Sequence, residues 1–273
     1  MPCFLNIACG STYVTGPEWE NVDYSARDQH VRRQDILGGL ETSAPDYEVV
    51  YCSHFLEHVP HDLVPGFLSR CRQLTRGDGL LRLVVPDAEM LLREYLAQRS
   101  AGEDAKADYA FVVFLDQCVR RRPGGRLGEF DRRIGNGELA GLRSYAEFLL
   151  GPESRPEPAG QGGTSLARKL ARLLARPDLL LQRLEPAYIR AVCALLPRAF
   201  REQNVSFTGI GERHQWMWDF SSLGAALREA GYTRIERASF DRSSRGDRLF
   251  APLDEVLGAP RKGHHQLFVE ARP

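Results

Sequence analysis

Three residues capable of acid–base chemistry lie close together in the first quarter of the chain. His54, Glu57 and His58 are spaced i, i+3 and i+4, so they would share one face if this stretch opens a helix. An imidazole titrates near neutral pH and can take a proton from a hydroxyl group. His214 opens a second suggestive segment, HQWMWD. His54, His58 and His214 are therefore the candidate catalytic bases.

The residue types in these segments also suit other uses. Glu57 could simply hydrogen-bond backbone amides at a polar helix start. Two imidazoles and a carboxylate could instead ligate a divalent ion that lowers the pKa of a hydroxyl. The tryptophans that follow His214 could stack on a sugar or ring, or pack one part of the fold against another. These uses stay open at this point, and no metal is assigned.

A second group of residues suits a nucleoside ligand. The apolar run 4–8 predicts a strand that leads into the small-residue turn ACGST, where backbone N–H groups can approach a ligand closely. Asp23 ends the next strand, where a carboxylate can accept hydrogen bonds from ribose hydroxyls. Neither GxGxxG nor GxxxxGKS occurs, so no phosphate cradle is expected. S-adenosylmethionine is an adenosyl ligand without phosphates, and it fits this pattern.

Alternating strands and helices must position these groups. Strands are predicted at 4–8, 20–23, 47–52, 80–85, 234–240 and 266–271, and helices at 59–74 and 220–230, with Gly231 as a cap. Such alternation predicts parallel βαβ units with right-handed crossovers. The expected fold class is α/β, a doubly wound Rossmann-like, mostly parallel sheet with a large, mainly helical insertion acting as a lid.

The expected domain organisation is a core of residues 1–96 and 206–273 and a helical insertion of residues 97–205 that covers the substrate. Within the insertion, a helix is predicted at 109–119, a loop at 151–163 and leucine-rich helices at 165–184. Ligands bind at the carboxyl edge of such sheets, so the insertion is expected there. Its arginines, at 120–133 and 168–201, could bind an anionic acceptor or lipid head groups, or stay solvated over apolar helices.

Composition excludes several classes of protein. The 273 residues are 43% hydrophobic and 26% charged, which is an ordinary globular mixture. Thirty-six basic residues balance 36 acidic ones, so no nucleic-acid partner is expected. No apolar run approaches the roughly 20 residues of a transmembrane helix. Six scattered cysteines and the lack of a signal-peptide pattern predict a cytoplasmic protein with reduced thiols.

Taken together, the segments LNIACGS, ENVDYS, DIL, DYEVVYCSHFLEHV, GDGLLRLVVPD and HQWMWDFSSLGAALREAGY have a family resemblance. In order and spacing the chain resembles class I S-adenosylmethionine-dependent methyltransferases of the methyltransferase-11 type, over about residues 3–95 and 214–240. The resemblance implies S-adenosylmethionine as cofactor. It places the cofactor against Ala8, Cys9, Gly10, Ser11, Asp23, Tyr24, Asp35, Ile36, Ser53 and His54.

Within that set, the resemblance implies that Asp23 holds the ribose, that Asp35 faces the adenine amine, and that the turn faces the methionine part. Ala8 departs from the family, which usually has glycine there. The covering helices that precede the first strand in many relatives are also missing, so the insertion or the C-terminal segment should supply the cover. A further resemblance, to ubiquinone-pathway O-methyltransferases, implies metal ligands near residue 57, although His54 replaces their first acid.

The expected activity is methyl transfer to the hydroxyl of a glycan or small molecule, with a histidine as general base. Two alternatives stay open: a different transfer from the same cofactor, such as aminocarboxypropyl transfer, and a non-catalytic module that binds it. The arginines suit an anionic acceptor, although the sequence identifies neither the acceptor nor the oligomeric state.

Overall fold

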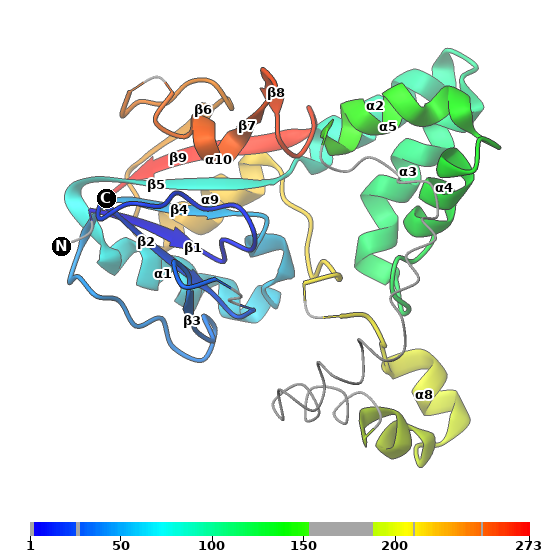
Figure 1. Ribbon diagram of the computed structural model, residues 1–273, viewed down its shortest axis with the longest axis horizontal. Helices are drawn as coiled ribbons and strands as arrows, with labels where there is room; N and C mark the ends of the chain where they lie inside the picture. Colours follow the sequence, from blue (N-terminus) through cyan, green and yellow to red (C-terminus); the bar gives the residue numbers. More distant parts are fainter. Residues whose placement is uncertain (1–2, 26–27, 153–187, 210, 247) are drawn as a thin grey trace, which may run out of the picture.

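A seven-stranded sheet forms the centre of the computed structural model, which describes residues 3–25, 28–152, 188–209, 211–246 and 248–273 (Figure 1). The strand order is β3-β2-β1-β4-β5-β9-β6. Strands β1 to β5 are parallel, and β9 is antiparallel to both of its neighbours. The first five strands thus follow the Rossmann order, which confirms the predicted fold class. The bounds are β1 (Phe4–Ile7), β2 (Trp19–Asp23), β3 (Arg32–Arg33), β4 (Tyr47–Ser53), β5 (Thr75–Pro86), β6 (Arg234–Ala238) and β9 (Gln266–Arg272).

The predicted strands agree with the observed ones because parallel strands buried on both faces are nearly continuous apolar runs. In β4, for example, Val49, Val50 and Cys52 are all buried. Strand β3 was not predicted, because it consists of two exposed arginines and has no apolar pattern. Strand β5 begins at Thr75, five residues earlier than the predicted start at residue 80.

Helices α1 (Val64–Leu74) and α9 (Phe220–Glu229) share one apolar core with the sheet. Asp219 caps the start of α9 with its carboxylate. Gly231 follows the end of α9 with a φ of +93°, which confirms it as the predicted cap. A separate apolar cluster joins the sheet to the C-terminal segment through Phe250 and Leu253. This segment contains α10 (Ala251–Asp254) and the hairpin of β7 (Glu255–Val256) and β8 (Ala259–Pro260).

His54, Glu57 and His58 do not open a helix, so the condition under which they would share one helix face is not met. Residues Leu56–His58 form a short 3-10 turn, and α1 begins only at Val64, after a second 3-10 turn at His61–Leu63. Val59 is extended, with φ −78° and ψ 127°, because the proline that follows it disfavours the helical conformation. The three side chains therefore do not lie along one helix face.

The second group of helices has its own apolar core (Figure 1). This helical body comprises α2 (Ala88–Ser100), α3 (Asp104–Val119), α4 (Leu127–Gly135), the 3-10 turn Ala140–Leu142 and α5 (Arg143–Leu150); α8 (Arg198–Asn204) follows later in the chain. Leu91 of α2 packs in the same cluster, so α2 belongs with these helices. The division at residue 97 stays a prediction. The leucine-rich helices predicted at 165–184, and the loop at 151–163 beyond its first two residues, lie outside the described residues.

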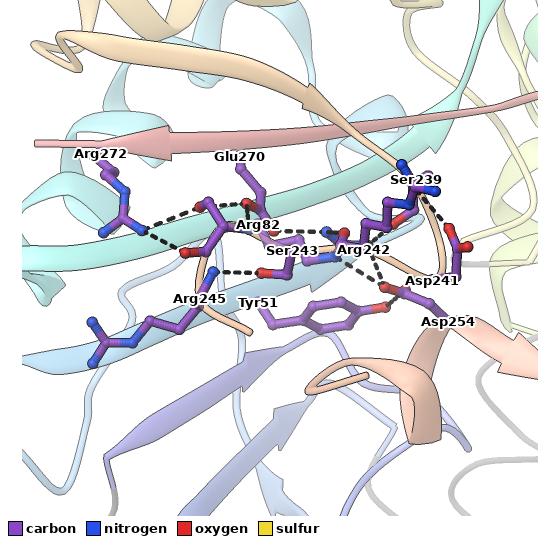
Figure 2. Close-up of polar contacts among 11 residues, drawn as sticks. Tyr51, Arg82, Ser239, Asp241, Arg242, Ser243, Arg245, Asp254, Glu270 and Arg272 are labelled. Atoms are coloured by element: carbon purple, nitrogen blue, oxygen red, sulfur yellow. Dashed lines mark hydrogen bonds and ion pairs between the residues drawn. The ribbon is translucent and has the colours of Figure 1, made fainter. Parts of the chain in front are cut away.

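A buried charge network anchors the C-terminal segment to the sheet (Figure 2). The Arg82 guanidinium donates four hydrogen bonds: to Asp254 at 2.9 Å, to Glu270 at 2.8 Å, and to the carbonyls of Ser239 and Arg242. One of its terminal nitrogens also lies 2.8 Å from the Asp254 carboxylate. The Tyr51 hydroxyl donates to the other oxygen of Asp254 at 2.6 Å. Because Asp254 ends α10, this network fixes α10 above β4 and β5.

The helical body and the C-terminal segment meet at two glycines. A Cβ on Gly263, whose φ is +94°, would lie 2.1 Å from the carbonyl oxygen of Leu149 at the end of α5. A Cβ on Gly151, whose φ is +87°, would lie 2.1 Å from the carbonyl oxygen of Arg261. The two backbones are therefore in direct contact, and no side chain fits between them.

We expect Gly263→Ala to lower the free energy of unfolding by more than about 2 kcal/mol, because a left-handed residue and a backbone clash combine. Gly258→Ala is the matched control, since Gly258 has a similar φ of +79° but nothing within 4 Å of the added Cβ. It should cost about 1 kcal/mol. Urea denaturation measures the free energy of unfolding of both variants. Equal losses of this free energy would contradict the close packing at Gly263.

Two simpler expectations can be compared directly. All six cysteines are free thiols, as predicted. Within the described residues, no helix has both the length and the apolar character needed to cross a lipid bilayer. A cytoplasmic location stays a prediction.

Candidate functional site

Three cavities adjoin one another at the carboxyl ends of the parallel strands. The turn cavity, about 210 Å³, lies between the turn Ala8–Thr12 and the C-terminal segment. The edge cavity, about 520 Å³, lies between the end of β2 and residues 206–215. The helix cavity, about 550 Å³, lies between the sheet edge and the helical body. Among the described residues, His54 alone lines all three.

The turn after β1 has the backbone expected of a ligand-binding turn. Ala8 and Gly10 both adopt left-handed conformations, with φ of +55° and +56°. Ala8 thus occupies a position that favours glycine, which accounts physically for the family's usual residue there. Asp23 accepts hydrogen bonds from the backbone N–H of Gly10 at 2.9 Å and of Ser25 at 2.6 Å. The Asp23 carboxylate is therefore held beside the turn.

The structure gathers nearly all the predicted cofactor residues around two of the cavities. Ala8, Cys9, Gly10, Ser11, Ser53 and His54 line the turn cavity, and Ala8, Asp23, Tyr24, Ile36 and His54 line the edge cavity. Asp35 is different: it is exposed, and its carboxylate accepts hydrogen bonds from the amides of Leu37 and Gly38, each at 3.2 Å. Whether each of these residues contacts a cofactor stays a prediction.

The three candidate histidines, His54, His58 and His214, converge around the buried carboxylate of Glu57. Glu57 is fully buried, and its Oε1 lies 3.2 Å from Nδ1 of His54 and 4.0 Å from Nε2 of His58. The rings of His58 and His214 meet edge to face, with centroids 4.8 Å apart. The backbone N–H groups of Gln215 and its successor donate to the Glu57 carbonyl at 2.6 and 3.2 Å. These bonds bring the distant His214 segment to the cluster.

Charges in this cluster compensate one another. Burial raises the pKa of Glu57, but its contact with His54 and the charges of His58 and His214 outweigh burial and lower that pKa to about 2. Glu57 is therefore ionised at neutral pH. Burial lowers the pKa of His214 to about 4 despite the attraction of Glu57, so His214 is neutral there.

His54 is strained as well as central. Its φ is +52°, a left-handed conformation that costs a residue other than glycine about 1 kcal/mol. Its backbone N–H donates to the Val84 carbonyl at 2.8 Å, which holds this conformation in place. Its Nε2 is buried and has no hydrogen-bond partner among the described residues. Residues held in such conformations cluster at functional sites.

Glu57, His58 and His214 also have the spacing of a three-ligand metal site. One ligand atom from each lies within 4.8 Å of the others. Nδ1 of His58 lies 2.9 Å from the Arg213 carbonyl, which can only accept, so Nδ1 is the donor and Nε2 faces Glu57. A proton on Nε2 or a cation beside it would each satisfy this arrangement. If the cluster binds a metal ion, its third ligand alongside Glu57 and His58 is therefore His214 and not His54.

The helix cavity has both apolar and polar lining residues. The helical body contributes Leu91, Val113, Leu127, Leu149 and Leu150, and the polar lining includes Gln117, Asp131, Lys262 and His265. Several of the body's arginines are already paired: Arg120 with Asp116, Arg126 with Glu129, and Arg133 with Glu138. An anionic acceptor stays a prediction, and the arginines at 168–176 lie outside the described residues.

Sequence reasoning did not find the residues that the C-terminal segment contributes. Arg261, Lys262 and Gln266 line the turn cavity, although they are about 250 residues away from the turn in the sequence. No motif marks them, because their place depends on how the segment 251–266 folds back over the sheet. The same holds for Ser206, Thr208 and Gly209, which line the edge cavity.

Comparison with known proteins gives distant likenesses. Neither a protein-family model nor a curated protein matches the chain. An S-adenosylmethionine-dependent methyltransferase from Clostridium acetobutylicum shares 17% identity, over 32% of this chain and 44% of that one, with a TM-score of 0.26. The DhpI–SAH complex shares 20% sequence identity, over 32% of this chain and 50% of that one, with a TM-score of 0.26. A SAM-dependent methyltransferase from Archaeoglobus fulgidus shares 11% sequence identity, over 99% of this chain and 85% of that one, with a TM-score of 0.37.

The alignment thus spans half or less of the length of the first two of these structures. Their scores describe a remote similarity, and the strand order given above establishes the fold by itself. What the chain remotely resembles thus includes two solved structures described as S-adenosylmethionine-dependent methyltransferases.

Proposed function

We propose that the protein is an S-adenosylmethionine-dependent methyltransferase that methylates a hydroxyl group of a small molecule, with His54 as the general base. The observation that carries this proposal is the place of His54. It lies where the turn, edge and helix cavities meet, between the small-residue turn and the helical body. A donor and an acceptor in separate cavities would therefore meet at this imidazole.

The residues present fit the proposed cofactor. The edge cavity has Asp23 for the ribose hydroxyls and Tyr24 and Ile36 beside the adenine, as the family resemblance implies. The turn cavity continues from it past Ala8, where the left-handed turn lets the backbone approach the rest of the ligand. When bound, the sulfonium group supplies an electrophilic methyl.

The chain's own contribution to the reaction is alignment and proton transfer. Nδ1 of His54 lies 3.2 Å from the Glu57 carboxylate. We assign the acceptor's proton to Nε2 of His54, which has no hydrogen-bond partner among the described residues. The buried, ionised Glu57 then stabilises the imidazolium that forms. His214 is a weak base because burial lowers its pKa to about 4. We assign His214 and His58 to holding Glu57 rather than to the proton itself.

The lining of the helix cavity favours one class of acceptor. Five apolar side chains of the helical body line it, together with a smaller number of polar groups and four histidines. Apolar walls stabilise the carbon skeleton of a ligand through burial, and a few polar groups orient it. An apolar small molecule with one hydroxyl fits this lining better than a glycan, whose many hydroxyls would lose their hydration. The helical body acts as the lid in this proposal.

Asp23→Asn tests the cofactor half of the proposal. Asparagine keeps the shape but offers a neutral acceptor, and a hydrogen bond to a charged group contributes about 1.5–3 kcal/mol. We expect the dissociation constant for S-adenosylhomocysteine, measured by titration calorimetry, to rise by roughly 10-fold to 100-fold. Asp46→Asn, an exposed residue outside the three cavities, is the control. Absence of binding by the wild type would overturn the proposed function.

A further inference from the structure

A second glutamate–histidine pair lies beside the helix cavity, apart from Glu57 and His54. His265 lines this cavity and is only 4% exposed. Its Nε2 lies 3.6 Å from a carboxylate oxygen of Glu94 on α2. Its Nδ1 is buried and has no hydrogen-bond partner among the described residues. His265 thus repeats the arrangement seen at His54, in which one ring nitrogen faces a carboxylate and the other has no partner.

Glu94 is held so that one of its oxygens faces the imidazole. Its Oε1 accepts from Nε2 of Gln98 at 2.8 Å and from the Tyr145 hydroxyl at 3.0 Å. The oxygen nearest His265 is the other one, Oε2. Because a carboxylate can only accept, we place the ring proton of His265 on Nε2. Its Nδ1 is then a hydrogen-bond acceptor.

The His265 ring is fixed by both parts of the molecule. The His265 carbonyl accepts from the backbone N–H of Asp87 at 3.0 Å, next to the last pair of the β5–β9 ladder. The Phe148 ring of α5 packs edge to face on the imidazole, with centroids 5.2 Å apart. Burial lowers the pKa of His265 against the attraction of Glu94, so the ring is neutral at pH 7. Little order has to be gained when such a ring binds a ligand.

The unpaired buried atoms beside the start of β9 are acceptors. Gln266, the next residue, also lines the helix cavity, and its Oε1 has no donor within the described part of the chain. Asp131, the carboxylate in the lining, already accepts from the Tyr109 hydroxyl at 3.1 Å. A buried acceptor without a donor is costly. The ligand group that complements Nδ1 of His265 is therefore one that donates a hydrogen bond.

We propose that Nδ1 of His265 binds a second polar group of the acceptor, an O–H or N–H group that donates a hydrogen bond, and that Glu94 positions the imidazole. This inference rests on the proposed function, in which one hydroxyl of the same acceptor reacts at His54. The acceptor then combines an apolar skeleton, which matches the leucines and Val113 of the lining, with two polar groups. Binding at the second group aligns the first for reaction.

Matched aromatic compounds test this inference because they differ only in the second group. The set comprises a naphthol, its dihydroxy and amino-hydroxy isomers, and the monomethyl ethers of the diols, which keep one hydroxyl but cannot donate from the other oxygen. We expect the wild-type kcat/KM to be roughly 5-fold to 100-fold higher for the best donor-bearing isomer than for its ether or the naphthol. Hydroxyl and amino isomers show which donor the site prefers.

Two substitutions separate the acceptor atom of His265 from its ring. His265→Phe keeps a buried ring without Nδ1 and should lower this preference roughly 5-fold to 100-fold. His265→Asn keeps an acceptor at the δ position and should retain most of the preference. His264→Phe is the control, because His264 is exposed and stacks on Phe148, which a phenyl ring can also do. Comparing ratios between variants cancels differences in the compounds' own reactivity.

Glu94→Gln tests the positioning residue with a readout that a loss of structure does not reproduce. Because Gln98 and Tyr145 donate to one oxygen, the new amide should turn its NH₂ group toward His265. Nε2 then becomes the acceptor and Nδ1 the donor. The monomethyl ether, whose oxygen can accept, should therefore gain roughly 2-fold to 10-fold in kcat/KM relative to the naphthol.

The outcomes separate this inference from the proposed function. Titration calorimetry should show wild-type affinity for S-adenosylhomocysteine in all four variants, and absence of binding by the wild type rejects the proposed function. If the wild type shows no preference, or if His265→Phe keeps it, methyl transfer stands and His265 does not bind the acceptor. If the wild type binds S-adenosylhomocysteine but methylates no compound of the set, the aromatic hydroxyl acceptor is rejected together with this inference.

Discussion

The His54→Asn variant is expected to lose methyl-transfer turnover by roughly 10²-fold to 10⁴-fold, the contribution of a positioned general base. Asparagine tolerates the left-handed φ of +52° and keeps an N–H group for Glu57, but it cannot take a proton. The loss should therefore fall on kcat, while S-adenosylhomocysteine binds as in the wild type. A panel of phenols and alcohols with a radiolabelled methyl donor provides the measurement.

Two comparisons show whether the loss belongs to the base. His30→Asn, on an exposed residue outside the cavities, should keep wild-type turnover. Dialysis against a chelator should also leave wild-type turnover unchanged. If activity disappears with the chelator and returns with a divalent ion, the reaction depends on a metal ion instead. Glu57, His58 and His214, whose ligand atoms lie within 4.8 Å of one another, would be its ligands. Full turnover in His54→Asn would reject the base outright.

The Arg82→Leu variant should lose about 3–5 kcal/mol of unfolding free energy. Asp254 and Glu270 would then stay buried without the cation that compensates them, because Arg82 is fully buried and reaches both carboxylates at 2.8 Å (Figure 2). Burial already raises the pKa of Asp254 against the opposing effect of Arg82. Because α10 ends at Asp254, the variant should also loosen the wall of the turn cavity.

Arg76→Leu is the control for this experiment, since Arg76 pairs with Glu48 and Asp78 at the surface. Exposed pairs contribute about 0–1 kcal/mol, so this variant should denature in urea close to the wild type. Losses of similar size in the two variants would show that the buried network contributes nothing particular to stability. A larger loss of S-adenosylhomocysteine affinity in Arg82→Leu would connect the network to the site.

Local patterns were enough to predict the sheet and part of the site. The buried strands are apolar runs, and each ends in the residues that then meet at the sheet's carboxyl edge. The turn at Ala8 and the carboxylate of Asp23 are neighbours because β1 and β2 pair in parallel, as the alternation of strands and helices implies. Helix α9 was predictable because Asp219 and Gly231 are local start and stop signals.

Contacts between distant segments decided the rest. Pro60 separated the His54 cluster from α1, and the cluster formed instead because backbone bonds bring the His214 segment to Glu57. Lys262 reached the turn cavity only through the folding of α10 and the packing of Gly263 on α5. The sequence thus determines which chemical group each residue carries. Which other residues that group contacts depends on the tertiary structure, because backbone hydrogen bonds between distant segments bring them together.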